Sequence, residues 1–266
     1  NIILIMAITA ALIKELREIT WIGMMECKKA LEETNGDIDL AIEELRKKGL
    51  AKAAKKADRE TFEWGIRILT EGGKAYVISV ACETDFLANS DRFKTMLDDV
   101  VNFLKSNGAD SKEAAQEYIN KNYALEMGEN LQVSNYAIFE GGVASAYVHS
   151  NGKLAALIVA AAGTDAEKAK QVAMHVTASN PEFLSADDIS DEVVEKEKSI
   201  QLEMMKNDPK MAGKPDEVLL KIIDGKMGKF KSEISLLEQD FVMDPNVKVK
   251  NFIGEKSITA FYRFSI

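Results

Sequence analysis

The chain has 266 residues, of which 46% are hydrophobic and 29% charged, and its net charge is −9. These proportions are typical of a globular protein with one large domain or a few smaller ones. The acidic balance argues against general nucleic-acid binding, because the neutralisation of phosphates needs a basic surface. The chain has only two cysteines, Cys27 and Cys82. This number indicates neither a disulfide scaffold nor a metal cluster, and it favours a reducing, cytoplasmic compartment.

The first five residues are apolar, but they lack the basic flank and the cleavage site of a signal peptide. They are also too short to span a membrane. We expect Met6 to be the natural start, with residues 1–5 an added extension.

Residues 6–56 contain three amphipathic patterns, in which apolar side chains recur at three, four and seven positions. Thr9 and Asp37 are expected N-caps, and Gly49 is expected to end the third helix. We therefore predict a small three-helix module resembling a ubiquitin-associated (UBA) fold. Its basic end, at Lys52, Lys55 and Lys56, is expected to be a solvated helical linker that leaves the module free as a separate arm. The apolar positions are Leu12, Leu16 and Ile19; Cys27, Ala30 and Leu31; and Ile38, Ala41, Ile42 and Leu45.

Residues 57–142 are predicted to form the first of two related core subdomains, so the fold class is α+β. Within it, two alternating runs joined by Gly72-Gly73 predict a hairpin, and a helix follows up to residue 105. A second helix over 111–123 and a strand over 131–139 complete this part. The helix before residue 105 is expected to bury Phe93, Met96, Leu97, Val100, Val101 and Leu104.

The run from Val80 to Phe86 ends an apolar strand and places a carboxylate and a large aromatic in a polar connection. We expect Asp85 and Phe86 at the rim of the hairpin, just before a helix. Two interpretations of Phe86 remain open. It folds onto its own core, as the burial tendency of phenylalanine favours, or it inserts into a partner.

Residues 143–184 and 233–266 are predicted to form the second core subdomain, which repeats the plan of the first. Gly152-Lys153 corresponds to Gly73-Lys74, and Thr164-Asp165 corresponds to Thr84-Asp85. The apolar run over 154–162 predicts a buried strand. Alternation at Ile258, Ala260, Tyr262 and Phe264 predicts a last strand.

Residues 185–232 are strongly charged, and the apolar stripe of their helical pattern is narrow. Breaks near Pro209 and Pro215 divide the segment into two helices, which predicts an antiparallel coiled-coil hairpin. Since so narrow a stripe cannot form a full core, we expect the hairpin to project and to pack either on an accessory partner or on a second copy. The second alternative is self-association through 185–232.

The residues give little support for enzyme chemistry. Gly72-Gly73-Lys74 lacks the earlier glycine of a phosphate-binding loop, and both cysteines lie on apolar elements, where burial is expected. His175 is expected to be a hydrogen-bonded helix histidine, and His149 the more exposed interaction candidate. We therefore expect a protein that is not an enzyme and needs no cofactor or metal.

Five motifs in order along the chain resemble bacterial elongation factor Ts, the guanine-nucleotide exchange factor for the translational GTPase elongation factor Tu. They cover nearly the whole chain. The motifs are residues 20–31 with 35–42, residues 80–86, residues 127–130, residues 173–176 with 180–183, and residues 241–245.

The resemblance implies a factor that binds elongation factor Tu carrying GDP and promotes GDP release by disrupting the Mg²⁺ and phosphate site, so that GTP can bind. Phe86 matches the phenylalanine that these proteins insert between helices of the GTPase domain, with Asp85 positioning it or adding a polar contact. Because Met24 and Met25 are adjacent, at least one of them is expected to be exposed. The implied partner-binding residues are Thr84, Asp85, Phe86, Arg17, Met24, Met25, Lys28, Met127, Gly128, His149, and Val242 and Met243 on a late return strand.

The chain departs from the family pattern in three places, one of which is Ser134-Asn135, where relatives often carry a basic pair. Trp21 and Ile22 replace small residues, so we expect a changed local fit in the helical module. The chain ends at Ile266, without the C-terminal helical module of many relatives, and we expect a lower partner affinity. A different class also remains open, an adapter whose UBA-like arm binds peptides and whose hairpin oligomerises, without exchange activity.

Overall fold

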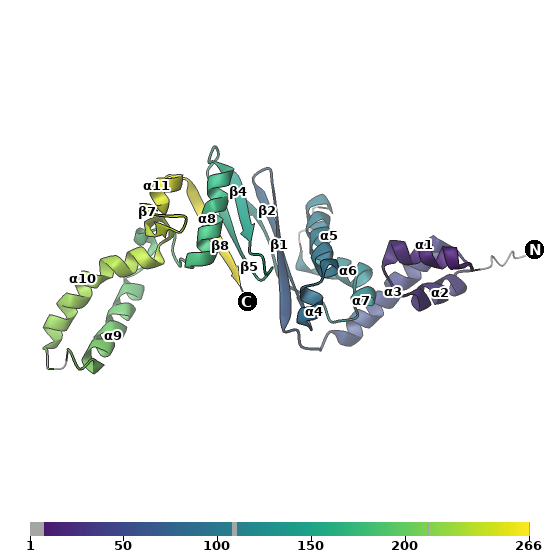
Figure 1. The fold of residues 1–266 in the computed structure, drawn as a ribbon, viewed down its shortest axis with the longest axis horizontal. Coiled ribbons are helices and arrows are strands. Elements are labelled where there is room, and N and C mark those ends of the chain that lie inside the picture. Colours follow the sequence, from purple (N-terminus) through teal and green to yellow (C-terminus); the bar gives the residue numbers. More distant parts are fainter. Residues whose placement is uncertain (1–7, 108–110, 212, 266) are drawn as a thin grey trace, which may run out of the picture. The chain divides into compact units, whose positions relative to one another are not determined.

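The structure is a computed structural model that describes residues 8–107, 111–211 and 213–265, and the expectations about residues 1–5 and Met6 lie outside this range. It is an α+β protein with helices and small sheets (Figure 1). The chain divides into two compact units. Unit 1 comprises Asn1–Leu69, Tyr76–Ile138 and Ser150–Lys153, and unit 2 comprises Thr70–Ala75, Phe139–His149 and Leu154–Ile266. None of the described helices has the length and apolar character needed to cross a membrane.

Unit 1 begins with three helices, α1 (Ala10–Thr20), α2 (Met24–Glu33) and α3 (Ile38–Lys56). The predicted N-caps are confirmed. Thr9 Oγ1 accepts the N–H of Leu12 at 3.2 Å, and Asp37 Oδ1 accepts the N–H of Leu40 at 3.0 Å. The three helices bury one common apolar core, made of Leu16, Ile22, Cys27, Ala30, Leu31, Ala41 and Leu45.

The expectation that Gly49 ends the third helix is wrong, because α3 continues through it to Lys56. Helix α3 packs against α6 (Lys112–Asn122) and α7 (Ala124–Met127). A Cβ atom at Gly49 would lie 2.9 Å from the carbonyl oxygen of Asn120. Glycine therefore serves here for the close approach of two backbones. The end of α3 is held against the rest of unit 1. It is therefore not a solvated linker that frees the three-helix module as a separate arm.

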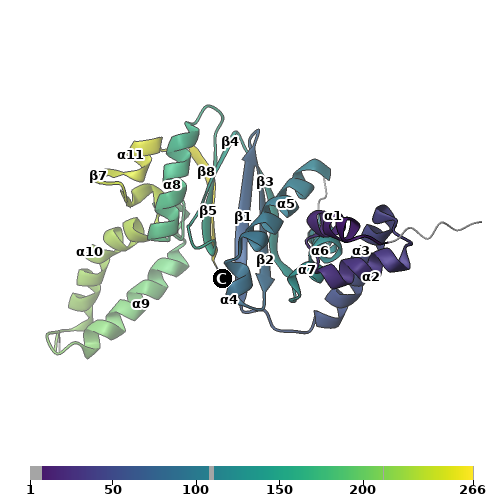
Figure 2. The same ribbon diagram turned by 45° about the vertical axis from the view of Figure 1, so that its right-hand side comes forward.

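The sheet of unit 1 has the strand order β1-β2-β3, from β1 (Glu63–Glu71), β2 (Lys74–Cys82) and β3 (Gln132–Glu140). The predicted turn at Gly72 and Gly73 is confirmed, and both glycines have positive φ angles, 57° and 81°. Two such residues in succession are typical of a tight type I′ hairpin turn. Helix α5 (Asp91–Asn107) lies along the sheet (Figure 2) and buries all six of its predicted apolar side chains.

Unit 2 contains a second sheet with the order β4-β5-β8, from β4 (Val143–Val148), β5 (Leu154–Ala160) and β8 (Ile258–Ser265). Both pairings are antiparallel, and Leu157 lies opposite Ala146 on β4 and Tyr262 on β8. Helix α8 (Ala166–Ser179) packs on β4 and β5. Asp165 caps this helix as Thr84 caps the helix that follows β2. The two sheets thus share a plan, a central strand followed by a capped helix.

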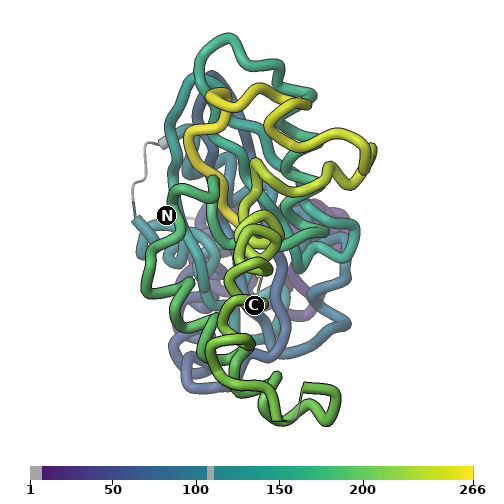
Figure 3. Tube along the Cα trace, turned by 90° about the vertical axis from the view of Figure 1, so that its left-hand side faces the viewer, coloured from purple at the N-terminus to yellow at the C-terminus, as the bar shows by residue number. Residues whose placement is uncertain are grey.

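The remaining part of unit 2 contains two long helices, α9 (Asp191–Asn207) and α10 (Asp216–Ile234), which run side by side in opposite directions (Figures 1 and 3). The chain then forms β6 (Asp240–Phe241), β7 (Asp244–Lys248) and α11 (Val249–Ile253). The helical pair has a narrow buried stripe, as its sequence pattern predicts. The buried residues of this stripe are Ile189, Val194, Met205, Leu219, Ile223 and Met227.

Gly49 offers a test of the α3 packing. Alanine is favoured over glycine inside a helix by roughly 1 kcal/mol. At Gly49, however, the added methyl meets a backbone oxygen, so we expect Gly49→Ala to lower the free energy of unfolding by about 1–3 kcal/mol. Urea denaturation followed by circular dichroism measures this change.

The matched control is Gly225→Ala in α10, where nothing lies within 4 Å of the added Cβ. This variant should instead raise the free energy of unfolding by about 0.5–1 kcal/mol. A stabilising effect of Gly49→Ala would contradict the close contact between α3 and α6.

Candidate functional site

The one-turn helix α4 (Asp85–Ala88) lies between β2 and α5, where the sequence places the rim residues. Thr84 has an extended backbone, and its Oγ1 accepts the N–H of Leu87 at 3.2 Å. Asp85 lies in the first turn, where a negative charge is favoured by the helix dipole. Its carbonyl oxygen also accepts a hydrogen bond from Asn89 Nδ2 at 2.9 Å. Local contacts therefore close α4 directly after the strand.

Phe86 is 85% exposed. The interpretation that Phe86 folds onto its own core is therefore wrong. The next residue, Leu87, packs against the core of unit 1. Since successive helical residues point about 100° apart, the inward direction of Leu87 turns Phe86 outward. The phenylalanine that does belong to the buried core next to Leu87 is Phe93 on α5, which is fully buried.

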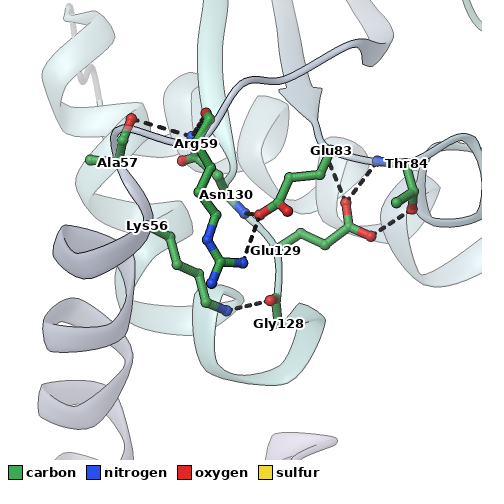
Figure 4. Close-up of polar contacts among 8 residues, drawn as sticks. All are labelled: Lys56, Ala57, Arg59, Glu83, Thr84, Gly128, Glu129 and Asn130. Carbon is green, nitrogen blue, oxygen red and sulfur yellow. Dashed lines mark hydrogen bonds and ion pairs between the residues drawn. The ribbon is translucent and has the colours of Figure 1, made fainter.

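The carboxylate of Glu129 holds the segment before α4 (Figure 4). Its Oε2 accepts the backbone N–H groups of Glu83 at 2.9 Å and Thr84 at 3.0 Å. Its Oε1 accepts the hydroxyl of Thr84 at 2.6 Å. The Thr84 hydroxyl thus donates to Glu129 while its oxygen caps α4. Hydrogen bonds to a charged group contribute roughly 1.5–3 kcal/mol each when shielded from water, and less at this partly exposed position.

A second set of bonds extends this network to the end of α3 (Figure 4). Glu83 Oε1 accepts the N–H of Asn130 at 2.6 Å and contacts Arg59 Nη1 at 3.4 Å. Asn130 Nδ2 donates to the carbonyl oxygens of Arg59 at 2.7 Å and Ala57 at 3.3 Å. Lys56 Nζ donates to the carbonyl oxygen of Gly128. Three segments far apart in sequence are therefore joined beside Phe86.

Glu83, Glu129 and Asn130 are not predicted as site residues from the sequence. Within the 127–130 motif, only Met127 and Gly128 are predicted to contact a partner. The sequence signal that could have found them is a carboxylate and an amide, Glu129 and Asn130, directly after a glycine. Gly128 has a φ of 73°, and the turn it makes directs the side chains that follow back toward the protein. Gly128 itself is exposed, whereas Met127 is half-buried against the core of unit 1.

The predicted residues of the helical module lie on its solvent face. Met24 is 57% and Met25 is 68% exposed, which confirms that at least one of them is exposed. Arg17 on α1 and Lys28 on α2 are exposed as well. Because Cys27 and Leu31 fill the inner face of α2, the two methionines remain outside as soft, adaptable side chains.

His149, Val242 and Met243 belong to unit 2. His149 is exposed at the end of β4, as expected, and its Nδ1 lies 3.1 Å from the hydroxyl of Tyr147. Val242 and Met243 are about half exposed, at 48% and 49%. Their placement on a strand is wrong, because they form the turn between β6 and β7. A two-residue turn exposes both side chains, whereas a strand would alternate them.

His175 on α8 fixes this turn from inside. Its side chain is fully buried, and its Nε2 lies 2.8 Å from Gln239 Oε1. Its Nδ1 accepts the N–H of Val242 at 3.1 Å. These two bonds select the neutral tautomer with the proton on Nε2. The expectation of a hydrogen-bonded helix histidine is confirmed. Burial lowers the pKa of His175, although the hydrogen bond with Gln239 acts in the opposite direction.

The two cysteines are buried, as predicted. Burial, reinforced by the charge of Glu129, raises the pKa of the Cys82 thiol to about 12, and burial also raises the pKa of Cys27. Neither sulfur is therefore a thiolate nucleophile near neutral pH. Within the described ranges, no group of three or more histidine, cysteine, aspartate or glutamate side chains is arranged to hold a metal ion.

The fold and the site define an α+β protein that presents exposed apolar side chains on short helices and turns. Residues 83–266 match the family model described as elongation factor TS. Elongation factor Ts of Histophilus somni strain 2336 is 44% identical over 264 residues, which is 97% of this chain and 91% of the relative. Elongation factor Ts of Klebsiella pneumoniae strain ATCC 700721 is 42% identical over 264 residues, with the same coverage. The chain therefore belongs to the elongation factor Ts family, whose members act in translation elongation during protein biosynthesis.

The contacts of His175 predict a pH-dependent stability. Since its folded pKa is lowered, the unfolded chain takes up the proton first when the pH falls below about 6.5. The stability that neutral His175 contributes to the folded protein is therefore fully present above that pH. It is lost as the pH falls through the pKa of His175 in the folded state. Between pH 7.5 and 5.5, the free energy of unfolding should decrease, by at most about 1.4 kcal/mol per pH unit for one proton.

The matched variant is His175→Gln, which stays neutral over this range. Urea denaturation at several pH values should give a flatter pH dependence for this variant than for the unchanged protein. Equal slopes for the two proteins would show that His175 does not carry the effect.

Proposed function

We propose that this protein binds elongation factor Tu carrying GDP and promotes GDP release by disturbing the site that holds Mg²⁺ and the phosphates, which allows GTP to bind. The observation that carries this proposal is the placement of Phe86, 85% exposed on a helix whose start is fixed by Glu129. Membership of the elongation factor Ts family supports it. In this role the protein makes and breaks no covalent bond.

A fixed, exposed phenylalanine suits the displacement of groups in a partner. A side chain that is held before binding loses little conformational freedom when it inserts, so more of the contact energy remains for binding. If the protein binds the nucleotide-free GTPase more tightly than the GDP-bound form, thermodynamic linkage requires that it weakens GDP binding by the same factor. Phe86 acts as the inserting side chain, and Thr84 and Asp85 set its direction.

Phe86 alone is too small a contact for the whole effect. Burying one phenylalanine is worth roughly 1.5–3 kcal/mol, which is about one to two decades in an equilibrium constant. Further contacts must add to it. The described residues proposed for them are Arg17, Met24, Met25, Lys28, Met127 and Gly128 in unit 1, and His149, Val242 and Met243 in unit 2.

We also propose the organisation that the sequence pattern predicts. Residues 6–56 form a UBA-like module, and residues 57–142 form the first core subdomain. Residues 143–184 with 233–266 form the second core subdomain, and residues 185–232 form a coiled-coil hairpin. The place of action is the cytoplasm, where a translation factor meets its GTPase.

Phe86→Ala tests the proposal. We expect the variant to lower the rate of GDP release from elongation factor Tu at least tenfold, because the inserting side chain is gone, and to leave the fold intact, because Phe86 is not part of the core. Stopped-flow release of a fluorescent GDP, at increasing concentrations of the protein, measures this rate.

Phe62→Ala is the matched control. Phe62 is also an exposed phenylalanine of unit 1, at 74%, but it lies outside the proposed contact set. It should retain the full rate. Equal acceleration by the Phe86 variant and the unchanged protein would remove the role of Phe86. Slow release with both would instead favour the adapter without exchange activity.

For the α9–α10 hairpin we propose self-association. Beyond its buried stripe, this pair of helices exposes four further apolar side chains, Ile200, Met204, Val218 and Leu220. Apolar side chains on both helices suit packing against a second hairpin.

The double variant Met204→Ser and Leu220→Ser should therefore shift the protein toward the monomer mass in sedimentation equilibrium. Ser232→Ala on α10 is a control that should leave the mass unchanged. A monomer mass for the unchanged protein at micromolar concentration would rule out self-association in that range.

A further inference from the structure

Trp21, which ends α1, has an unusual backbone conformation. Its N–H donates to the carbonyl oxygen of Arg17 at 2.8 Å, and its φ is 58°, in the left-handed region. Glycine or asparagine normally fills this position after a helix, and a bulky aromatic residue is strained there. Such strain persists where a side-chain contact compensates for it.

The ring of Trp21 has such a contact. The guanidinium carbon of Arg92 lies 5.0 Å from the centre of the Trp21 ring and 5.2 Å from the centre of the Tyr123 ring. Both distances are within the range of cation–π attraction. Arg92 also forms a two-point ion pair with Glu126, Nε to Oε1 at 2.6 Å and Nη2 to Oε2 at 2.9 Å. We call these four side chains, Trp21, Arg92, Tyr123 and Glu126, the Arg92 clamp.

Without the contacts of the clamp, the positive charge of Arg92 would be unfavourable at its position in the fold. It lies in the first turn of α5, where the helix dipole disfavours a positive charge. Its side chain is only 28% exposed, and that of Glu126 is 10% exposed. Burial alone would lower the pKa of Arg92, but the hydrogen bond and charge of Glu126 outweigh it and raise the pKa. The guanidinium is therefore firmly charged where it meets the indole.

The clamp joins the two parts of unit 1 that carry the proposed contacts. Trp21 lies in the corner between α1 and α2, three residues before Met24 and four before Met25. Arg92 lies at the start of α5, directly after the helix that bears Phe86. Two contact sites bind one partner together only when their spacing matches it, and a fixed spacing removes an ordering cost.

We propose that Trp21 and Arg92 are positioning residues for the recognition of elongation factor Tu. The Arg92 clamp holds the corner between α1 and α2, with Met24 and Met25, at a fixed place relative to Phe86. This inference rests on the exchange function proposed above. The role of the clamp is in the affinity for elongation factor Tu, whereas the role of Phe86 is at the nucleotide site of that partner.

The test separates binding from displacement in the stopped-flow assay of GDP release. We expect Trp21→Gly and Arg92→Ala each to raise the half-saturating concentration of the protein about three- to tenfold, the range that one cation–π contact supports. The maximal release rate should not change, because Phe86 is intact. The double variant should be no worse than Arg92→Ala, since Arg92→Ala already removes the Trp21 contact together with the ion pair to Glu126.

Two variants control for local structure. Trp21→Gly relieves the left-handed backbone, so a loss of binding in it reflects the ring and not helix damage. Trp21→Phe retains an aromatic face and should restore much of the affinity. Lys94→Ala removes another cation from the start of α5, one whose pairing with Asp91 is exposed at 3.7 Å, and should leave the half-saturating concentration unchanged.

A measurement without the partner tests the clamp itself. Two tryptophans give two indole N–H signals in a nuclear magnetic resonance spectrum, and Trp21→Phe identifies that of Trp21. Arg92→Ala should shift this signal, and Lys94→Ala should not. An unmoved signal would overturn the clamp. If Trp21→Gly and Arg92→Ala accelerate GDP release with an unchanged half-saturating concentration, the positioning role alone is overturned. No acceleration by the unchanged protein would overturn the exchange function and this role with it.

Discussion

The carboxylate of Glu129 is the constraint on which the candidate site depends. It accepts two backbone N–H groups and one hydroxyl from Glu83 and Thr84. These groups lie at the end of a strand, where no further strand pairing satisfies them. The N–H of the half-buried Glu83 would be costly to leave without an acceptor, so the carboxylate stabilises the strand end, and its bonds to Thr84 fix the start of α4. The direction of Phe86 follows from this one side chain together with the inward packing of Leu87.

Contacts between segments far apart in sequence also fix the other parts of unit 1. The end of α3 is joined to the 128–130 turn by Lys56 and Asn130, and its middle approaches α6 closely at Gly49. The corner between α1 and α2 meets α5 through Trp21 and Arg92. The three-helix module is therefore integrated with the first sheet and its helices. Exposed methionines and an exposed phenylalanine are thus carried on a scaffold whose parts are mutually fixed, which is what binding without a large ordering cost requires.

The role of His175 could be predicted from the sequence, whereas the role of Gly49 could not. Thr9 and Asp37 were predictable as caps because a cap is decided by residues three positions apart. His175 was predictable as a buried, hydrogen-bonded residue because its neighbours on α8 are apolar. Gly49 was not predictable, since the same residue type ends helices and permits close packing. Only the position of Asn120 distinguishes the two.

The sequence by itself determined the α+β class, the main helices and strands, the burial of both cysteines and, through its ordered motifs, the elongation factor Ts family. These features depend on local periodicity, on short-range capping and on residue order. Only the tertiary structure decided the exposure of Phe86, the turn at Val242 and the pairing of Glu129 with Thr84. The partners in that pairing are 45 positions apart. No local pattern specifies which distant carboxylate meets a strand end, because that choice depends on how the helices and sheets pack together.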